Sequence, residues 1–451
     1  MADQSRVSAV DLSGPIGRAT WNIAWPVMVT QALFTVLHLV DTFWVGRLGK
    51  AAVAGVALSG SVVGVLFAVG SVFTVGAMAT AARAAGANSP AGVASSLRHA
   101  LVLVALFSLP MAAAGAVFAG SLLALFGPAG DVLSAGTPYM RWVLAACPGF
   151  FAGMVMYSVF QALGDTRTPM YVMLASNIAN IALDPILIFG WFGLPRLGTA
   201  GAAIATVSVQ LVGLFVMAVV MYRRGLLKAG PLRRTTFGTL LSIGVPAGFQ
   251  GVTRPVTGML MFALVTRFGT AAMAAFGIGM RALEVIFVYL SGLSSAGEAL
   301  VGQSLGRGDP GLAERVAKRV VLTGSLLQVV TMPLLFLFAA PVITLFSSDP
   351  EVVRHGTVYL RFVTPALLVL GFVTGWGSAQ RGAGATTVPM VAALVSNWAV
   401  KLPLALVLSR VVGVGLAGVW LGVGASVVVE ALILMFGFVG GGWKLKKVVW
   451  N

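Results

Sequence analysis

Two acidic residues lie inside long apolar stretches, each at helical spacing from other polar side chains. Asn177, Asn180 and Asp184 are spaced three and four residues apart, so a helix places all three on one face. Earlier in the chain, a second polar stripe contains Gln31, Thr35, His38 and Asp41 or Thr42. Two carboxylates that share a dehydrated site cannot both ionise cheaply, so such a pair takes up a proton near neutral pH or binds Na⁺. Asp41 and Asp184 are therefore candidates for a site that binds H⁺ or Na⁺.

The composition indicates which kind of element carries these acids. The 451 residues include 29 Lys and Arg and 13 Asp and Glu, so charged residues make up 9% of the chain, against roughly 25% in a soluble domain. Hydrophobic residues reach 58%, which excludes disorder and leaves too few charges to solvate a soluble protein of this length. The net charge is +16, but the basic residues lie singly between apolar runs, which argues against a nucleic-acid partner. The single cysteine, Cys147, excludes a disulfide framework and a cysteine-based metal site.

We expect an all-α polytopic membrane protein with twelve transmembrane helices. A membrane helix needs about 20 mostly apolar residues, and the alternation typical of a membrane barrel is absent from the sequence. The start of the chain lacks a basic region followed by a short apolar run, so we expect no cleaved signal peptide. The predicted spans are 19–41, 51–80, 98–120, 137–162, 168–192, 199–222, 236–264, 271–300, 317–340, 355–380, 387–409 and 414–440.

The distribution of Lys and Arg predicts the orientation of these helices. Of the basic residues, 18 fall on the side that contains both termini, 8 on the opposite side and 3 within spans. Because basic residues favour the cytoplasmic side, both termini should be cytoplasmic in a multi-pass protein of the cell membrane. Attraction to lipid headgroups follows from the same basic surplus.

The second half of the chain repeats the first at an offset of 220 residues. Gly164–Met170 aligns with Gly384–Met390, and Pro26 aligns with Pro246. Chance similarity between apolar helices would match Leu, Val and Ala rather than Gly and Pro in order. Two six-helix lobes in the same orientation are therefore expected, and such bundles commonly provide alternating access with the substrate cleft between them. The predicted domains are a first lobe at 1–222, a cytoplasmic linker at 223–235 and a second lobe at 236–451.

The repeat also separates scaffold residues from functional candidates. Residues that recur in both halves, among them Tyr139 and Tyr359, are expected to serve the common scaffold. A carboxylate at membrane depth costs about 2.5–3.5 kcal/mol on insertion scales, so it is rarely kept without a use. A structural alternative stays open, in which Asp41 caps the end of its helix and Asp184 bonds to Asn180. Polar residues inside a span that occur in one half only are better functional candidates, among them Asp41, Asp184 and Asn180, which fall on Met261, Leu404 and Val400.

Two motifs resemble those of the multidrug and toxic compound extrusion (MATE) family. The first is Gln161-x-x-Gly164-Asp165-x-x-x-Pro169, which recurs in degenerate form in the second half. The second, Gly-x-Ala-Gly-Ala-Ala-x-Ala-Thr, runs from 198 to 206. The resemblance extends over essentially the whole chain. It implies a secondary active multidrug efflux transporter, not an enzyme, that exports amphipathic or cationic organic compounds by antiport with H⁺ or Na⁺ and needs no cofactor.

Within this family, the sequence resembles the DinF-like branch. In that branch, acids at the positions of Asp41 and Asp184 form the cation site, and the resemblance implies that Asn180, Thr206 and the backbone carbonyl of Ala202 complete it. Pro26 matches a first-helix proline whose bending accompanies protonation, although Pro246 repeats it and leaves a scaffold role open. The NorM-like branch uses acids on helices seven and ten, and here both predicted helices lack Asp and Glu.

Other polar and soft side chains are candidates for the substrate cavity. Expected partners are drug-like small molecules and membrane lipids, and the protein is expected to be a monomer. The main alternative is a lipid or oligosaccharide-lipid flippase of the same superfamily, which would often have fourteen spans and a large cationic cavity. An integral-membrane enzyme would need clustered His, Asp or metal ligands, and a channel would conduct without gradient coupling. The cavity candidates are Gln31, Thr35, His38, Tyr157, Met173 and Asn177.

Overall fold

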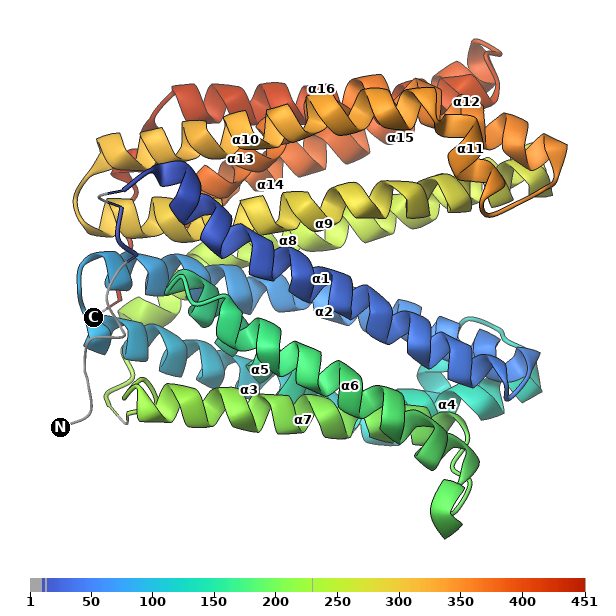
Figure 1. Ribbon diagram of the computed structural model, residues 1–451, viewed down its shortest axis with the longest axis horizontal. Helices are drawn as coiled ribbons and strands as arrows, with labels where there is room; N and C mark the ends of the chain where they lie inside the picture. Colours follow the sequence, from blue (N-terminus) through green and yellow to red (C-terminus); the bar gives the residue numbers. More distant parts are fainter. Residues whose placement is uncertain (1–9, 13, 229, 451) are drawn as a thin grey trace. The chain divides into compact units, whose positions relative to one another are not determined.

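The computed structural model describes residues 10–12, 14–228 and 230–450, and every regular element within these ranges is a helix (Figure 1). Nine helical segments of this described chain are each long and apolar enough to cross a bilayer. They are α1 (Ile16–Gly46), α2 (Lys50–Gly86), α3 (Pro90–Ala124), α6 (Arg167–Phe189), α7 (Thr199–Arg223), α9 (Thr270–Gly306), α10 (Pro310–Leu337), the segment Thr387–Val411 and α16 (Leu416–Val439).

Three further spans complete the predicted twelve. α4 (Gly130–Ala145) and α5 (Cys147–Ala162) meet at 52°, and α12 (Pro350–Leu367) and α13 (Leu370–Gly382) meet at 49°. α8 (Arg234–Val265), with 32 residues, is long enough to be the twelfth predicted span, although it is less apolar than the other described spans. Pro148 lies at the start of α5 and Pro365 near the end of α12. Because proline cannot donate a helical hydrogen bond, a bend is expected at both places.

The segment Thr387–Val411 is a helix with irregular turns. It consists of α14 (Thr387–Leu394), the π-helical η4 (Val395–Lys401), α15 (Leu402–Leu406) and the π-helical η5 (Val407–Val411). Pro403 lies between the two π-helical parts and removes one backbone donor from the helix. Its counterpart in the first half, α6, is regular α-helix throughout. The short elements are η2 (Trp191–Gly193), η3 (Thr266–Phe268), α11 (Ala339–Thr344) and η6 (Gly442–Leu445).

Several helices extend beyond the apolar stretches from which they were predicted. α3 begins at Pro90 rather than at 98, and α10 begins at Pro310 rather than at 317. Ser89 and Asp309, which are separated by the repeat offset of 220, cap these helices by accepting hydrogen bonds from backbone N–H groups. Hydropathy predicts which residues of a helix lie in the lipid. The N-capping residue and the proline that follows it mark where the helix begins.

The described chain divides into two compact units. Its first unit comprises residues 26–244 and 449–450, and its second unit comprises residues 10–25 and 245–448. The divisions fall inside α1, at Pro26, and inside α8, next to Pro246. These units are defined by packing, whereas the lobes at 1–222 and 236–451 were inferred from the repeat and stay a prediction. Residues 1–9 of the predicted first lobe lie outside the described chain.

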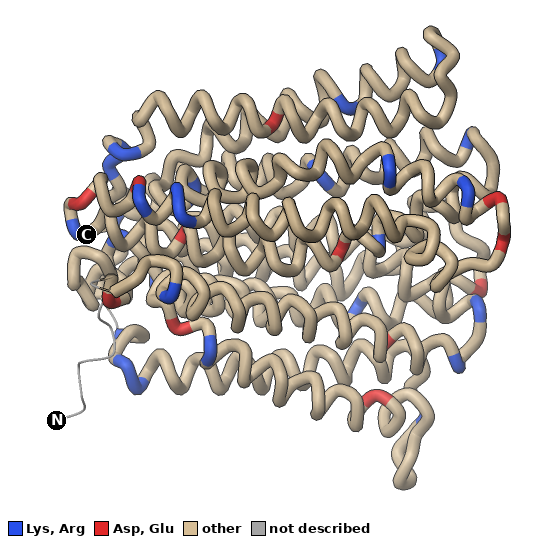
Figure 2. Tube along the Cα trace, turned by 45° about the horizontal axis from the view of Figure 1, so that its top comes forward, with Lys and Arg blue, Asp and Glu red and all other residues tan. Residues whose placement is uncertain are grey.

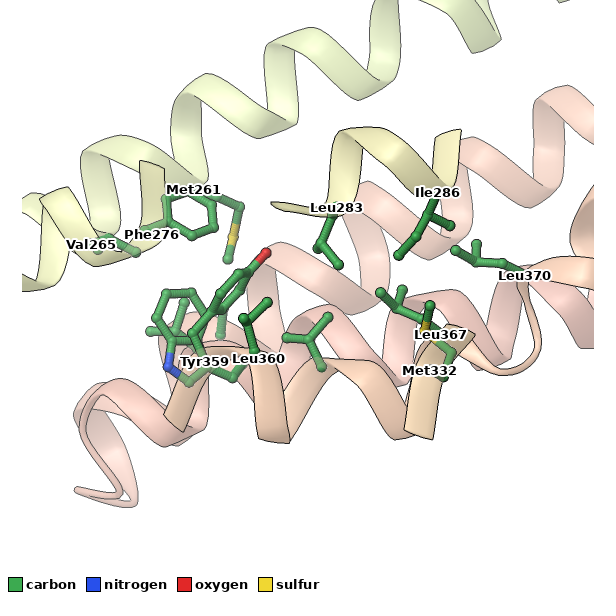
Figure 3. Close-up of a cluster of buried hydrophobic side chains, with 14 of the residues drawn as sticks. Met261, Val265, Phe276, Leu283, Ile286, Met332, Tyr359, Leu360, Leu367 and Leu370 are labelled. Atoms are coloured by element: carbon green, nitrogen blue, oxygen red, sulfur yellow. The ribbon is translucent and has the colours of Figure 1, made fainter. Parts of the chain in front are cut away.

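Each unit has buried apolar clusters of its own. In the second unit, the rings of Phe276, Tyr359 and Trp420 lie 4.6–5.5 Å apart between centroids and belong to a large cluster with residues from every α-helix between α8 and α16 (Figure 3). In the first unit, a smaller cluster contains Val45, Ala52, Ile188 and Ala202. Charged residues lie mostly toward the ends of the helices, and few occur along their middles (Figure 2).

Glycines allow two helix pairs to touch at equivalent places in the two units. A Cβ added to Gly201 of α7 would lie 2.5 Å from the carbonyl oxygen of Leu187 in α6. A Cβ added to Gly418 of α16 would lie 2.7 Å from the backbone of Leu408 in η5. Small residues of this kind let membrane helices approach backbone to backbone. The contact at Gly201 therefore fixes α6 against α7.

We predict that Gly201→Ala forces α6 and α7 apart and destabilises the detergent-solubilised protein by about 1–3 kcal/mol. Gly60→Ala in α2 is the matched control, because a Cβ there meets no atom within 4 Å. Alanine also favours a helix over glycine by about 1 kcal/mol, so this control should unfold at or above the wild-type temperature. Thermal unfolding followed by tryptophan fluorescence measures both. Equal unfolding temperatures for the two variants would contradict the close contact.

Candidate functional site

The first unit brings Asp41 of α1 and Asp184 of α6 together in its interior. Both side chains are buried, and their carboxyl groups are close enough to hydrogen-bond to one another. Thr206 of α7 donates to Asp41 Oδ2 at 3.3 Å. Asn180 Nδ2 donates to Asp184 Oδ1 at 3.3 Å and to Thr206 Oγ1 at 3.4 Å. Four of the residues predicted for the cation site thus form one connected group between three helices.

This group contains more acceptors than donors. Asp41 Oδ1, Asp184 Oδ2, Asn177 Oδ1 and Asn180 Oδ1 are buried, and each lacks a hydrogen-bond partner within the described residues. A buried acceptor left without a donor costs about 1–3 kcal/mol. Asn177 is held in place by donating its amide to the Met173 carbonyl at 3.0 Å. Because all four unpartnered atoms are oxygens, the arrangement is suited to a proton or a hard cation.

The local sequence explains how α6 presents these groups. Asn177, Asn180 and Asp184 are all buried, as expected for one face of a helix packed against its neighbours. Pro185 follows Asp184 inside α6 and has no N–H for the carbonyl of Ile181. The helix therefore has a weak point directly beside the acid.

An apolar cap closes one end of the site. Val45, Ile188 and Ala202 lie one helical turn from Asp41, Asp184 and Thr206 respectively, and all three belong to a single buried cluster. Trp44 and Phe189 pack against this cluster, with ring centroids 6.1 Å apart. Ala202 was predicted as a carbonyl ligand, and it lies in this cap. Its role as a ligand stays a prediction.

Tyr139 is a neighbour of the acids that the sequence reasoning did not select. It lies in α4, packs against the apolar cap and interacts electrostatically with both Asp41 and Asp184. The repeat pairs it with Tyr359, which is a buried core residue of the second unit. Recurrence in both halves assigned Tyr139 to the common scaffold and gave no sign that it lies near the acids.

The exposed polar stripe on α1 does not include the buried Asp41. Gln31, Thr35, His38 and Thr42 are exposed, whereas Asp41 is buried against α6 and α7. The sequence left Asp41 and Thr42 as alternatives for this stripe, and the structure places Thr42 there. His38 still acts electrostatically on Asp41 from one turn away.

The other predicted cavity residues are less exposed than this stripe. Met173 and Asn177 are buried in α6. Tyr157 of α5 is partly buried and lies near Thr30 and Gln161. Pro26 is buried within α1, and the Thr30 hydroxyl donates to its carbonyl at 2.8 Å. Lining of a substrate cavity by these residues stays a prediction.

Known proteins similar to this chain identify its family. The MatE family model matches twice, at residues 26–186 and 246–407, so the two matches start one repeat offset apart. A probable multidrug resistance protein NorM of Thermotoga maritima is 30% identical over 444 residues, which cover 95% of this chain and 93% of the relative. An FAD transporter of Shewanella oneidensis is 29% identical over 412 residues, which cover 89% and 90% respectively.

A solved structure has the same fold. The structure of a Vibrio cholerae MATE transporter superposes with a TM-score of 0.87, covers 96% of this chain and 99% of its own, and is 22% identical in sequence. This match confirms the predicted all-α fold of twelve transmembrane helices in two lobes. The two matches of the family model confirm the family that the sequence motifs indicated. The chain therefore belongs to the MatE family of multi-pass membrane transporters and is not an enzyme.

Proposed function

We propose that this protein is a proton-coupled antiporter that exports amphipathic, often cationic, organic molecules. Asp41 and Asp184 form its proton-binding site. The observation that carries the proposal is the close approach of two buried carboxyl groups, which Thr206 and Asn180 connect and each of which keeps one oxygen without a donor. A shared proton supplies the missing donor and removes one of two like charges. Proton binding therefore stabilises this geometry, and proton release destabilises it.

The position of the acids supports the DinF-like branch of the family. Both acids belong to the first unit, on α1 and α6, whereas α8 contains no Asp or Glu and α12 contains only Glu351 in its first turn. Na⁺ is the alternative coupling ion, because the side-chain oxygens of Asn180 and Thr206 and the carbonyl of Ala202 are candidate ligands for a hard cation. The acid pair favours the proton, since a proton can bridge two carboxyl groups directly.

The proposed cycle uses the apolar cap and the proline of α1. With both termini cytoplasmic, the cap of Val45, Ile188 and Ala202 is on the outer side of the acids. The cap must open before a proton can enter from outside, and protonation then favours the state that releases the drug outward. Loss of the proton to the cytoplasm resets the transporter. Pro26 is the proposed hinge, because it weakens α1 and coincides with the division between the compact units.

The substrates of this transporter are small organic molecules. One similar protein is named for multidrug resistance and another for FAD transport, which supports a broad range of solutes. One chain contains both halves of the repeat, so we propose that a monomer in the lipid bilayer is the working unit. It uses no cofactor, and H⁺ is its coupling ion.

We predict that Asp41→Asn and Asp184→Asn each abolish pH-gradient-driven efflux of ethidium from proteoliposomes, because asparagine cannot take up and release the proton. Glu284→Gln is the control, since Glu284 is an exposed acid of α9 in the second unit. It should transport at the wild-type rate. Efflux at the wild-type rate by either asparagine variant would remove that acid from the mechanism. Efflux driven by a Na⁺ gradient at constant pH, and not by a pH gradient, would replace H⁺ with Na⁺.

A second prediction concerns the exposed polar stripe of α1, which we propose lines an aqueous cavity. In a Cys147→Ala background, Thr35→Cys should react readily with a charged, water-soluble thiol reagent. Leu37→Cys is the buried control on the same helix, and Val36→Cys is the exposed control on another face, because position 36 lies about 100° around the helix from position 35. Both should react slowly, because the thiolate forms and meets the reagent only in water. A Val36→Cys protein that reacts as fast as Thr35→Cys would contradict a cavity confined to the polar stripe.

A further inference from the structure

A second cluster of charged side chains lies within the second unit, inside three of the predicted spans. Arg254 of α8 and Glu430 of α16 form an ion pair with an Nη2–Oε1 distance of 2.8 Å. Lys401 of η4 donates to Asn397 Oδ1 at 2.5 Å. Thr257 of α8 donates to the same oxygen at 3.2 Å. Three helical segments therefore meet at a polar cluster that contains two cations and one acid.

The positive charge of this cluster exceeds its negative charge. Glu430 balances Arg254, but no ion pair that involves Lys401 occurs among the described residues. Lys401 is repelled by Arg254 and attracted by Glu430, so the three side chains act on one another. An unbalanced charge at membrane depth is costly unless it has a use. The cluster would therefore gain from a bound negative charge.

The exposed part of the cluster is its cationic part. The Arg254 side chain is 49% exposed, whereas the Glu430 side chain is only 8% exposed. Within the described chain, one N–H of the Arg254 side chain is hydrogen-bonded, and a guanidinium has five. Arg254 is thus able to donate to a second acceptor without releasing Glu430.

The repeat assigns these cations to the second half alone. Asn177 and Asn397 are equivalent, and each donates its amide to the carbonyl four residues earlier, at 3.0 and 2.9 Å. The equivalents of Arg254 and Lys401 in the first half are apolar, namely Phe34 and Ile181. The same scaffold thus carries acids in one half and an excess of cations in the other. This is the criterion that selected Asp41 and Asp184.

The helix that carries Lys401 is also irregular at this point. Asn397 and Lys401 both lie in the π-helical η4, whereas the equivalent α6 is a regular helix. Single π-helical turns inside α-helices occur often at functional sites. Gly422 of α16 packs against this segment, and a Cβ there would lie 2.9 Å from the Lys401 carbonyl oxygen. The irregular turn is therefore held in place by a close helix contact.

We propose that Arg254 and Lys401 form an anion-binding subsite for a carboxylate or similar oxyanion on the transported molecule. The inference rests on the proposed transport function and extends its substrate class to amphiphiles that carry an anionic group, including zwitterions. Arg254 supplies paired N–H donors that match a carboxylate, and Lys401 supplies a point charge. Glu430 keeps Arg254 oriented, and Asn397 keeps Lys401 oriented.

The test compares two rhodamine dyes that differ only in one group, a free carboxylate or its methyl ester. Equilibrium binding to the purified full-length protein is measured by fluorescence anisotropy, without any ion gradient. Lys401→Met should weaken binding of the free acid by about tenfold or more and leave the ester within about twofold, because it removes a charged hydrogen-bond donor and little volume. Lys401→Arg should restore binding of the acid. Arg281→Gln, which removes an exposed cation of α9 in the same unit, should change neither affinity.

Each other outcome overturns the subsite. Unchanged binding of the acid by Lys401→Met, or equal losses for acid and ester, would show that Lys401 does not recognise the anionic group. Displacement of the acid by phosphatidylglycerol would assign the cluster to a lipid headgroup instead. Retained binding of the ester shows that the variant is folded. Because binding is measured without a gradient, failure of proton coupling at Asp41 and Asp184 would leave this result unaffected.

Discussion

A carboxyl group is costly to ionise where water cannot solvate it, and the interior of the first unit is organised around two such groups, Asp41 and Asp184. Asp41 and Asp184 present four oxygens, for which Thr206 and Asn180 supply two donors. The oxygens that stay unpartnered are those that a proton or metal cation would satisfy. The backbone contact at Gly201 holds α6 against α7 and so preserves this deficit. A site that lacks donors responds strongly to a single positive charge.

Duplication gave the protein one scaffold used twice with different charges. The helix caps at Ser89 and Asp309, the glycine contacts at Gly201 and Gly418, and the side-chain bonds of Asn177 and Asn397 recur in both halves. The acids Asp41 and Asp184 and the cations Arg254 and Lys401 do not recur. Packing and capping are needed wherever the same helices cross, whereas a buried charge is tolerated only where it is balanced or used. The two halves were thus free to differ in charge.

The spans and the acid group could be predicted from the sequence because both depend on local periodicity. Length and apolar content set each span, and spacing of three and four residues put Asn177, Asn180 and Asp184 on one face. Contacts from other helices carry no such signal. Tyr139 approaches the acids because α4 packs there, and Asp41 rather than Thr42 is buried because α6 and α7 lie on that side. The π-helical turns of η4 likewise depend on a distant glycine as well as on Pro403.

The apolar cap beside the acids has a consequence for energy conservation. A protein that uses an ion gradient must not conduct that ion on its own, since each uncoupled proton dissipates the gradient as heat. Val45, Ile188 and Ala202 contribute no side-chain donor or acceptor, so they interrupt any chain of hydrogen bonds along which a proton could hop. Trp44 and Phe189 thicken this barrier. The cap thus blocks proton conduction through the static structure. Proton flow in the proposed antiporter therefore requires movement of the helices themselves.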